Sequence, residues 1–111
     1  MAEQAQPADD AEAVVYVIYQ GTPADRFDRG YYLERHLPLV MHAWGRHGLE
    51  RLTAFFPALE APGTVAVCEC RFRDEASIER SFNSPECEAV MADITRYTDL
   101  RSIQLRARPL R

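Results

Sequence analysis

The chain has 111 residues, of which 47% are apolar, so it is long enough for one hydrophobic core and too short for two ordinary domains. The first twelve residues hold four of the seventeen acids, and this excess accounts for the formal net charge of -4. Thirteen acids and thirteen scattered arginines remain in the rest of the chain, a balance that argues against a nucleic-acid-binding protein. The sequence contains no lysine, which excludes a Schiff-base mechanism.

Residues 1–12 predict a disordered tail, and residues 13–111 predict a single domain. The opening segment has neither the basic nor the apolar region of a signal peptide, and no later stretch approaches the roughly 20 apolar residues of a membrane span. The three cysteines lack the spacing of a disulfide framework, which suits a reducing compartment. We therefore expect a cytoplasmic protein that does not insert into a membrane.

The first predicted element is a strand at residues 14–21, which is β-branched and aromatic on both of its faces. A helix is predicted to begin near residue 23, because Thr22 can cap it and Asp25 stands where a capping box places its acid. Pro38 predicts a kink or break at residue 37, with His36 beside it. The helix then resumes, and Gly48 can end it.

The second half of the chain predicts two strands, a helical region and a last strand. Strands are expected at residues 52–59 and 64–73, joined by the turn "EAPG", and a final strand at 102–110. Residues 74–84 have helical spacing and an acidic first turn. A further helix is expected from Ser84 as cap and Pro85 at its first position.

The order strand, helix, strand, strand, helix, strand indicates an α+β protein with the ferredoxin-like βαββαβ fold. Two helices on one face of the sheet leave the other face bare, and the doubly apolar first strand indicates that this face is covered. We therefore expect a homodimer, a dimeric α+β barrel in which two sheets pack face to face and each subunit encloses a cavity.

Alternation along residues 64–73 divides the third strand between the two sheet faces. The helices need an apolar face, and Ala66, Cys68, Cys70 and Phe72 supply one. The opposite set, predicted to turn into the barrel and line the substrate site, consists of Val65, Val67, Glu69 and Arg71. The alternative is reversed parity, in which the cavity is lined by Cys68, Cys70 and Phe72 and the thiols become candidates.

The segments "FDRGYYLERHLPLVMHAWGRHGL" and "SPECEAVMADITRYTDL" together resemble the EthD family, a branch of the dimeric α+β barrel superfamily. The resemblance spans about residues 13–108. Its motif positions are Phe27, Tyr31, Tyr32, His36, Pro38, Leu39, Val40, Gly48, Leu49, Asp93, Ile94, Thr98 and Asp99. It implies a small dimeric barrel without an obligatory cofactor. Related barrels include lactone isomerases, polyketide cyclases and cofactor-free monooxygenases, so the family fixes the fold better than the function.

His36 is the leading catalytic candidate, because imidazole titrates near neutral pH and the family match includes this position. Its structural alternative is a histidine that bonds the carbonyls freed by Pro38. Asp93 is expected either to anchor this imidazole or to cap a helix. Tyr32 is expected to help orient the imidazole of His36. Tyr31 is a candidate substrate contact, although the rings of both tyrosines could also simply pack on the sheet.

No metal site is expected, because the histidine spacings of six and five residues do not place two imidazoles on one helical face. Cys68 and Cys70 project from one strand face about 6.6 to 6.8 Å apart, at the limit of disulfide geometry. They are most simply buried apolar residues.

Two functions remain open from the sequence. The first is general acid–base chemistry without a cofactor, a cyclisation, isomerisation or oxygenation of a small aromatic or polyketide-type molecule, with His36, Tyr32 and Asp93 as catalytic residues. The second is a binding or carrier protein that holds a hydrophobic catabolite for a separate monooxygenase.

Overall fold

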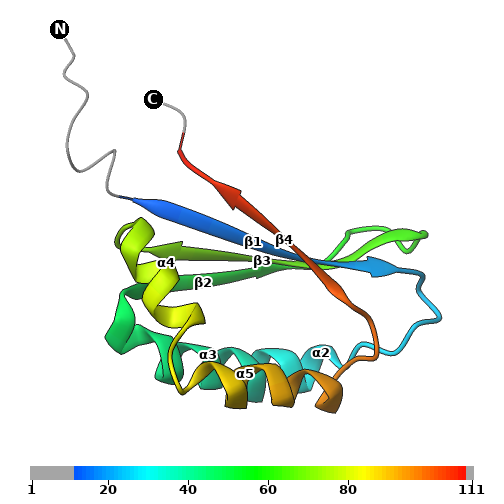
Figure 1. Cartoon of the computed structure of the whole chain (residues 1–111). Helices are drawn as coiled ribbons and strands as arrows, with labels where there is room; N and C mark the ends of the chain where they lie inside the picture. The colour runs from blue at the N-terminus through cyan, green and yellow to red at the C-terminus, as the bar shows by residue number, and fades with distance from the viewer. Residues whose placement is uncertain (1–11, 110–111) are drawn as a thin grey trace, which may run out of the picture.

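A four-stranded antiparallel sheet, with the helices gathered on one of its faces, forms the frame of the molecule (Figure 1). The computed structural model describes residues 12–109. The strands are β1 (Ala13–Gly21), β2 (Leu49–Phe55), β3 (Gly63–Phe72) and β4 (Ser102–Ala107), in the order β2-β3-β1-β4. The predicted α+β, ferredoxin-like fold is confirmed. Residues 1–11 of the predicted tail lie outside the described residues.

The register between β1 and β3 assigns each side chain to a sheet face. Val15 pairs with Cys70 and Val17 with Cys68, and these rows face the helices. Tyr16 pairs with Glu69 on the opposite face, because successive residues of a strand point to opposite sides. The predicted parity of the third strand is confirmed. Its helix-facing residues, all buried, are Ala66, Cys68, Cys70 and Phe72.

The helical region after β1 starts later than its sequence predicts. Asp25 does accept a hydrogen bond from the Thr22 N–H at 2.7 Å, but the two residues close only a turn. The helix begins with α2 (Arg29–Tyr31), where the Asp28 carboxylate accepts the Tyr31 N–H at 3.0 Å. The expected start near residue 23 is therefore wrong, because Asp28 provides the cap that the helix uses.

The sequence predicts a kink or a break at residue 37, and the helix passes Pro38 without a break. A π-helical turn at Tyr32–His36 leads directly into α3 (Leu37–Trp44), and the Leu37 N–H donates to the carbonyl of Tyr32. Proline has no N–H, and its ring crowds the carbonyl four residues earlier, so a wider turn just before it accommodates the ring. A 3-10 turn at Gly45–His47 follows and ends at Gly48, as predicted.

Two shorter helices cover the rest of the same sheet face. The Asp74 carboxylate accepts the Ser77 N–H at 2.8 Å and caps α4 (Glu75–Phe82). Residues 83–86 form a turn instead of the predicted helix start, and α5 (Cys87–Asp93) begins after Glu86 and passes into a 3-10 turn at Ile94–Arg96. Between β2 and β3, the chain leaves the ladder before Pro57, which cannot donate to it.

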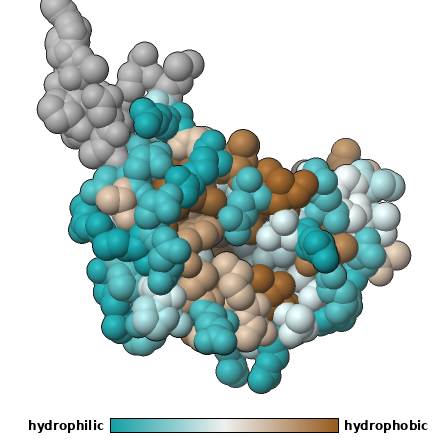
Figure 2. Space-filling view, in the orientation of Figure 1, coloured by the Kyte–Doolittle hydropathy of each residue, from teal (hydrophilic) through white to brown (hydrophobic). Residues whose placement is uncertain are grey.

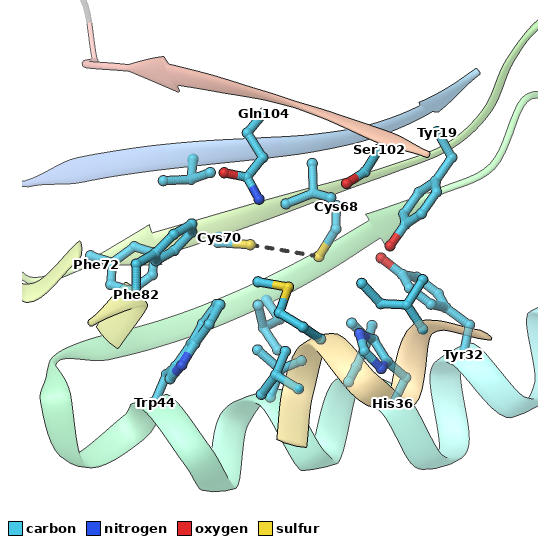
Figure 3. A pocket seen from close by; sticks show the side chains of 18 residues that line it. Tyr19, Tyr32, His36, Trp44, Cys68, Cys70, Phe72, Phe82, Ser102 and Gln104 are labelled. Carbon is cyan, nitrogen blue, oxygen red and sulfur yellow. Dashed lines mark hydrogen bonds between the residues drawn. The ribbon is translucent and has the colours of Figure 1, made fainter. Parts of the chain in front are cut away.

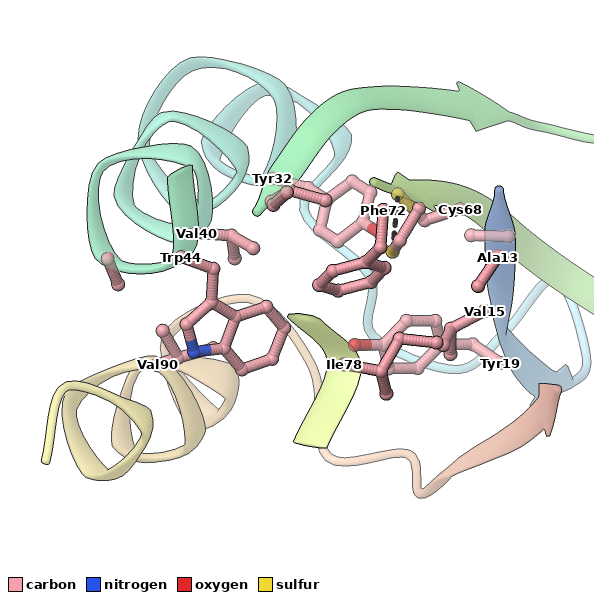
Figure 4. Close-up of a cluster of buried hydrophobic side chains, with 14 of the residues drawn as sticks. Ala13, Val15, Tyr19, Tyr32, Val40, Trp44, Cys68, Phe72, Ile78 and Val90 are labelled. Atoms are coloured by element: carbon pink, nitrogen blue, oxygen red, sulfur yellow. Dashed lines mark hydrogen bonds between the residues drawn. The ribbon is translucent and has the colours of Figure 1, made fainter. Parts of the chain in front are cut away.

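The core lies between the sheet and these helices. In Figure 4, Trp44 and Val40 of α3, Val90 of α5 and Ile78 of α4 point toward Phe72 and Val15 of the sheet. Trp44 stacks on Phe82, with 4.8 Å between the ring centroids. Phe82 thereby connects the end of α4 to α3.

Gly48 provides a test of this packing. Its φ of 116° is unfavourable for side chains, and an added Cβ would collide with Ser77 of α4. Gly48→Ala should lower the free energy of unfolding in urea by about 2 kcal/mol or more, through left-handed strain and overpacking. Gly30→Ala is the matched control, since the nearest atom to an added Cβ, Asp28 Oδ1, is 3.5 Å away. Equal losses in both variants would contradict this account.

Candidate active site

A cavity of about 50 Å³ lies between the helices and the sheet (Figure 3). The space-filling view shows apolar side chains gathered around a hollow on this side of the molecule (Figure 2). The lining residues come from all four strands and from the helices: Val15, Val17, Tyr19, Tyr32, His36, Leu37, Val40, Trp44, Leu52, Cys68, Cys70, Phe72, Phe82, Val90, Met91, Ile94, Ser102 and Gln104. The cavity therefore has apolar walls and a few polar groups, as small-molecule sites do.

His36 enters this cavity from the π-helical turn and is held from behind by Asp93. The Nδ1 atom of the buried imidazole lies 2.9 Å from Oδ2 of Asp93, at the end of α5. The hydroxyl of Tyr31 donates to the other oxygen, Oδ1, at 2.7 Å. The predicted pairing of Asp93 with His36 is present, and Tyr31 supports the carboxylate instead of lining the cavity.

Burial and hydrogen bonding act in opposite directions on this pair. Burial lowers the pKa of His36 below its ordinary value of 6.5, and the bond to Asp93 only partly opposes this. Burial also disfavours the Asp93 anion, but the hydrogen bonds from His36 and Tyr31 outweigh it and lower the pKa of that carboxyl. At neutral pH the imidazole is thus neutral beside a carboxylate, which holds the proton on Nδ1. Nε2 then keeps its lone pair and can accept a proton.

Aromatic rings surround the imidazole on its other sides. Tyr32 stacks on His36 with 5.6 Å between centroids and an interplanar angle of 16°, and the Tyr97 ring lies 4.6 Å away. The hydroxyls of Tyr19 and Tyr97 are 2.6 Å apart and bonded to each other. Burial raises the pKa of Tyr32 and Tyr97. Both phenols therefore stay neutral, and Tyr32 orients the imidazole through its ring.

Glu69 and Arg71, which are predicted to line the substrate site, do not face His36. These residues, with Val65 and Val67, leave β3 on the face turned away from the helices, where Glu69 accepts hydrogen bonds from Tyr16 at 2.8 Å and from Arg71 at 3.4 Å. The physical reason is that the cavity opens on the same face that the helices cover. The cavity wall opposite the helices is therefore built by Cys68, Cys70 and Phe72.

The sequence alone does not identify several residues that line the cavity. Ser102 and Gln104 project from β4 into the cavity (Figure 3). Their alternation with Ile103 and Leu105 is visible in the sequence, but only the pairing of β4 with β1 shows which set faces the helices. Trp44 packs in the core and also lines the cavity, and its buried Nε1 has no hydrogen-bond partner among the described residues.

Two further features concern metals and membranes. Within residues 12–109, no three histidine, cysteine, aspartate or glutamate side chains cluster so as to hold a metal ion. No helix in this part of the chain has the length and apolar character needed to cross a bilayer.

The fold and the cavity define a ferredoxin-like α+β protein with an apolar cavity between its sheet and its helices. The EthD domain model matches residues 20–101, and the chain belongs to the EthD family. Comparison with curated proteins gives no match.

Solved structures that share the fold include three with TM-scores of 0.59 to 0.79. An EthD-like protein from Ralstonia eutropha JMP134 is 23% identical, with 89% of this chain and 92% of that chain covered and a TM-score of 0.79. An ethyl tert-butyl ether degradation (EthD) family protein from Bacillus halodurans C-125 is 14% identical. The match covers 89% of this chain and 99% of that chain, with a TM-score of 0.67. SnoaB, a cofactor-independent oxygenase from Streptomyces nogalater, is 14% identical. The match covers 90% of this chain and 96% of that chain, with a TM-score of 0.59.

The pairing of His36 with Asp93 predicts a specific titration. In ¹⁵N NMR, the His36 ring should titrate below 6.5 and carry its proton on Nδ1 when neutral. Because Asp93 raises the pKa of His36, Asp93→Asn should lower it further. Asp99→Asn, which removes a carboxylate from an exposed ion pair with Arg26, should leave the titration unchanged. A rise in the His36 pKa in Asp93→Asn would contradict the assignment.

Proposed function

We propose that this protein is a cofactor-independent enzyme that performs general acid–base chemistry on a small aromatic or polyketide-type molecule. The reactions that fit are cyclisation, isomerisation and oxygenation. The observation that supports the proposal best is the buried imidazole of His36, which lines an apolar cavity and has its Nδ1 atom 2.9 Å from Asp93. Membership in the EthD family and the likeness in fold to an oxygenase described as cofactor-independent support the same reaction class.

In this proposal, Nε2 of His36 takes a proton from an acidic C–H or O–H group of the ligand. Asp93 holds the proton on Nδ1 and stabilises the imidazolium that forms, and the stacked Tyr32 ring fixes the orientation of the imidazole. The resulting carbanion or phenolate is stabilised by delocalisation over its own ring system, which is why an aromatic or polyketide-type ligand suits this base. Ser102 and Gln104 offer polar contacts from β4.

The second candidate is a carrier that holds a hydrophobic catabolite for a separate monooxygenase. The apolar walls of the cavity, built by side chains such as Val15, Val40 and Phe72, favour binding in either case. Only turnover distinguishes an enzyme from a carrier, because a carrier needs no base.

The free thiols of Cys68, Cys70 and Cys87 also fit the proposal of a cytoplasmic location.

The enzyme proposal predicts activity that depends on His36. With a panel of anthrones, small phenols and polyketone lactones, followed by absorbance and oxygen uptake, the purified protein should turn over at least one compound. His36→Ala should reduce the rate by about 10²- to 10⁴-fold, the usual contribution of a general base. The rate should also fall on the acid side as His36 gains a proton, below pH 6.5.

His42→Ala is the matched control, since His42 lies on the exposed side of α3 and outside the cavity. Full activity in a folded His36→Ala variant would remove the catalytic role. Binding without turnover across the panel, unchanged in His36→Ala, would favour the carrier.

We further propose that a second copy of the chain covers the open sheet face and completes the barrel. Three large apolar side chains on this face, Phe55, Ile103 and Leu105, are each about half exposed. Phe55 pairs with Val67, Val67 with Ile18, and Ile18 with Ile103, so an apolar row crosses all four strands. Exposed rows of this kind mark interaction surfaces.

Light scattering should therefore give about twice the mass of one chain at low micromolar concentration. Ile103→Glu should shift the mass toward one chain, because it places a charge within the apolar row. Leu59→Glu is the control, since Leu59 is 81% exposed in the loop between β2 and β3. A wild-type protein that stays folded with the mass of a single chain would rule out the shared barrel.

A further inference from the structure

Two buried hydroxyl groups beside the cavity share a single hydrogen bond. The hydroxyl oxygens of Tyr19, on β1, and of Tyr97, just after the 3-10 turn at Ile94–Arg96, lie 2.6 Å apart, and either group could donate. The two residues are 2% and 0% exposed. Each phenol carries one hydroxyl proton, and the bond between them uses only one of the two. One proton of the pair therefore has no acceptor among the described residues.

The cavity decides which of the two protons is left over. Tyr19 lines the cavity, whereas Tyr97 does not. When Tyr97 donates to Tyr19, the remaining proton belongs to Tyr19 and can be given to an oxygen atom of a ligand in the cavity. When the bond runs the other way, the remaining proton stays on Tyr97, where the described residues offer it no acceptor. Because a buried donor without a partner is unfavourable, a ligand oxygen in the cavity favours the first arrangement.

The Tyr19 hydroxyl lies toward the end of the cavity that holds His36. Tyr97 contacts both residues, because its ring centroid is 4.6 Å from that of the imidazole and its hydroxyl bonds to Tyr19. In Figure 3 the Tyr19 hydroxyl points from the sheet toward the helical segment that carries Tyr32 and His36. The same end of the cavity therefore offers a base, Nε2 of His36, and a separate O–H donor.

The phenol of Tyr19 keeps its proton at neutral pH. Burial raises the pKa of Tyr19, and the hydrogen bond from Tyr97 only partly opposes this. Tyr32 also lines the cavity, but a hydrogen bond to Cys68 is among the causes that, after burial, raise the pKa of its phenol, so its proton already has an acceptor. Tyr19 is thus the phenol whose proton remains available for a ligand.

A donor in this position suits a carbonyl group whose neighbouring C–H is the acid. When a base removes a proton from the carbon next to a carbonyl, the electron pair of the C–H bond forms a C=C bond and the negative charge moves to the carbonyl oxygen. A hydrogen-bond donor already directed at that oxygen stabilises the enolate more than the ketone. The hydroxyl of Tyr19 therefore complements the base that His36 provides.

We propose that the Tyr19 hydroxyl donates to the carbonyl oxygen of an aromatic ketone while His36 removes a proton from the carbon beside that carbonyl. This assignment rests on the function proposed above and narrows its substrate class to ketones that can form an enolate. In the step, the proton moves to Nε2, the enolate oxygen accepts the hydrogen bond, and Tyr19 keeps its own proton, so no oxidant or reductant takes part. Tyr97 is a positioning residue, which donates to the Tyr19 oxygen.

The test uses 1-indanone, a small aromatic ketone, and indane, which has the same rings without the oxygen. Trp44, the only tryptophan in the chain, lines the cavity, so its fluorescence reports the binding of either compound. Tyr19→Phe should bind 1-indanone about 10-fold more weakly than the wild type and indane equally well, because one hydrogen bond is lost. The ¹³C=O infrared band of bound 1-indanone should lie at lower frequency in the wild type than in Tyr19→Phe.

Tyr16→Phe is the matched control, since Tyr16 lies on the same strand and its hydroxyl bonds to Glu69 on the opposite sheet face. It should leave both the affinity and the infrared band unchanged. Tyr97→Phe should keep the lower-frequency band, because Tyr19 still donates. The proposal is overturned if the wild type does not bind 1-indanone, or if Tyr19→Phe shows the wild-type affinity or the wild-type band.

Exchange of the C2 protons of 1-indanone with D₂O, followed by ¹H NMR, separates this assignment from the proposed function. The wild type should accelerate the exchange, His36→Ala should abolish the acceleration, and Tyr19→Phe should reduce it by about 10²- to 10³-fold. Exchange that depends on His36 but is equally fast in Tyr19→Phe would overturn the assignment and leave the function standing. A lower-frequency band without any accelerated exchange would support the Tyr19 donor and contradict the base.

Discussion

The pairing of β1 with β3 determines which side chains the helices cover, and the cavity depends on it. Val15 opposite Cys70 and Tyr16 opposite Glu69 place an apolar row toward the helices and a polar row away from them. A slip of one residue in β3 would turn Glu69 and Arg71 into the core and expose the thiols. Because burying a carboxylate without a suitable partner costs several kcal/mol, this register is strongly specified.

The bond between Asp93 and His36 joins helices from the two halves of the chain at this cavity. The imidazole is buried, so its polar atoms need partners, and Asp93 satisfies Nδ1 while Tyr31 satisfies the second carboxylate oxygen. The same arrangement leaves Nε2 able to accept a proton. The π-helical turn that accommodates Pro38 contains both Tyr32 and His36, so the backbone irregularity and the site coincide.

Much of the fold could be predicted from local patterns, because alternation and helical spacing depend on neighbouring residues. The parity of β3 followed from the need of the helices for an apolar face, and Gly48 ends its helix as expected. The side of the sheet on which the cavity lies cannot be read locally, so the sequence assigns Glu69 to the substrate site although its side chain lies on the face turned away from His36. The helix start at Arg29 differs from the predicted start because the Asp28 side chain caps the helix, whereas Thr22 and Asp25 form a turn.

We propose that the ligand binds on the helix side of the sheet, against His36, and not on the open face beside Glu69. A crystal structure of the protein soaked with an anthrone or another planar phenol tests this most directly. The account predicts the ring system between Val40 and Cys68, with an acidic group of the ligand within hydrogen-bonding distance of Nε2 of His36. A ligand seated on the open face, in contact with Glu69 and Tyr16, would contradict it.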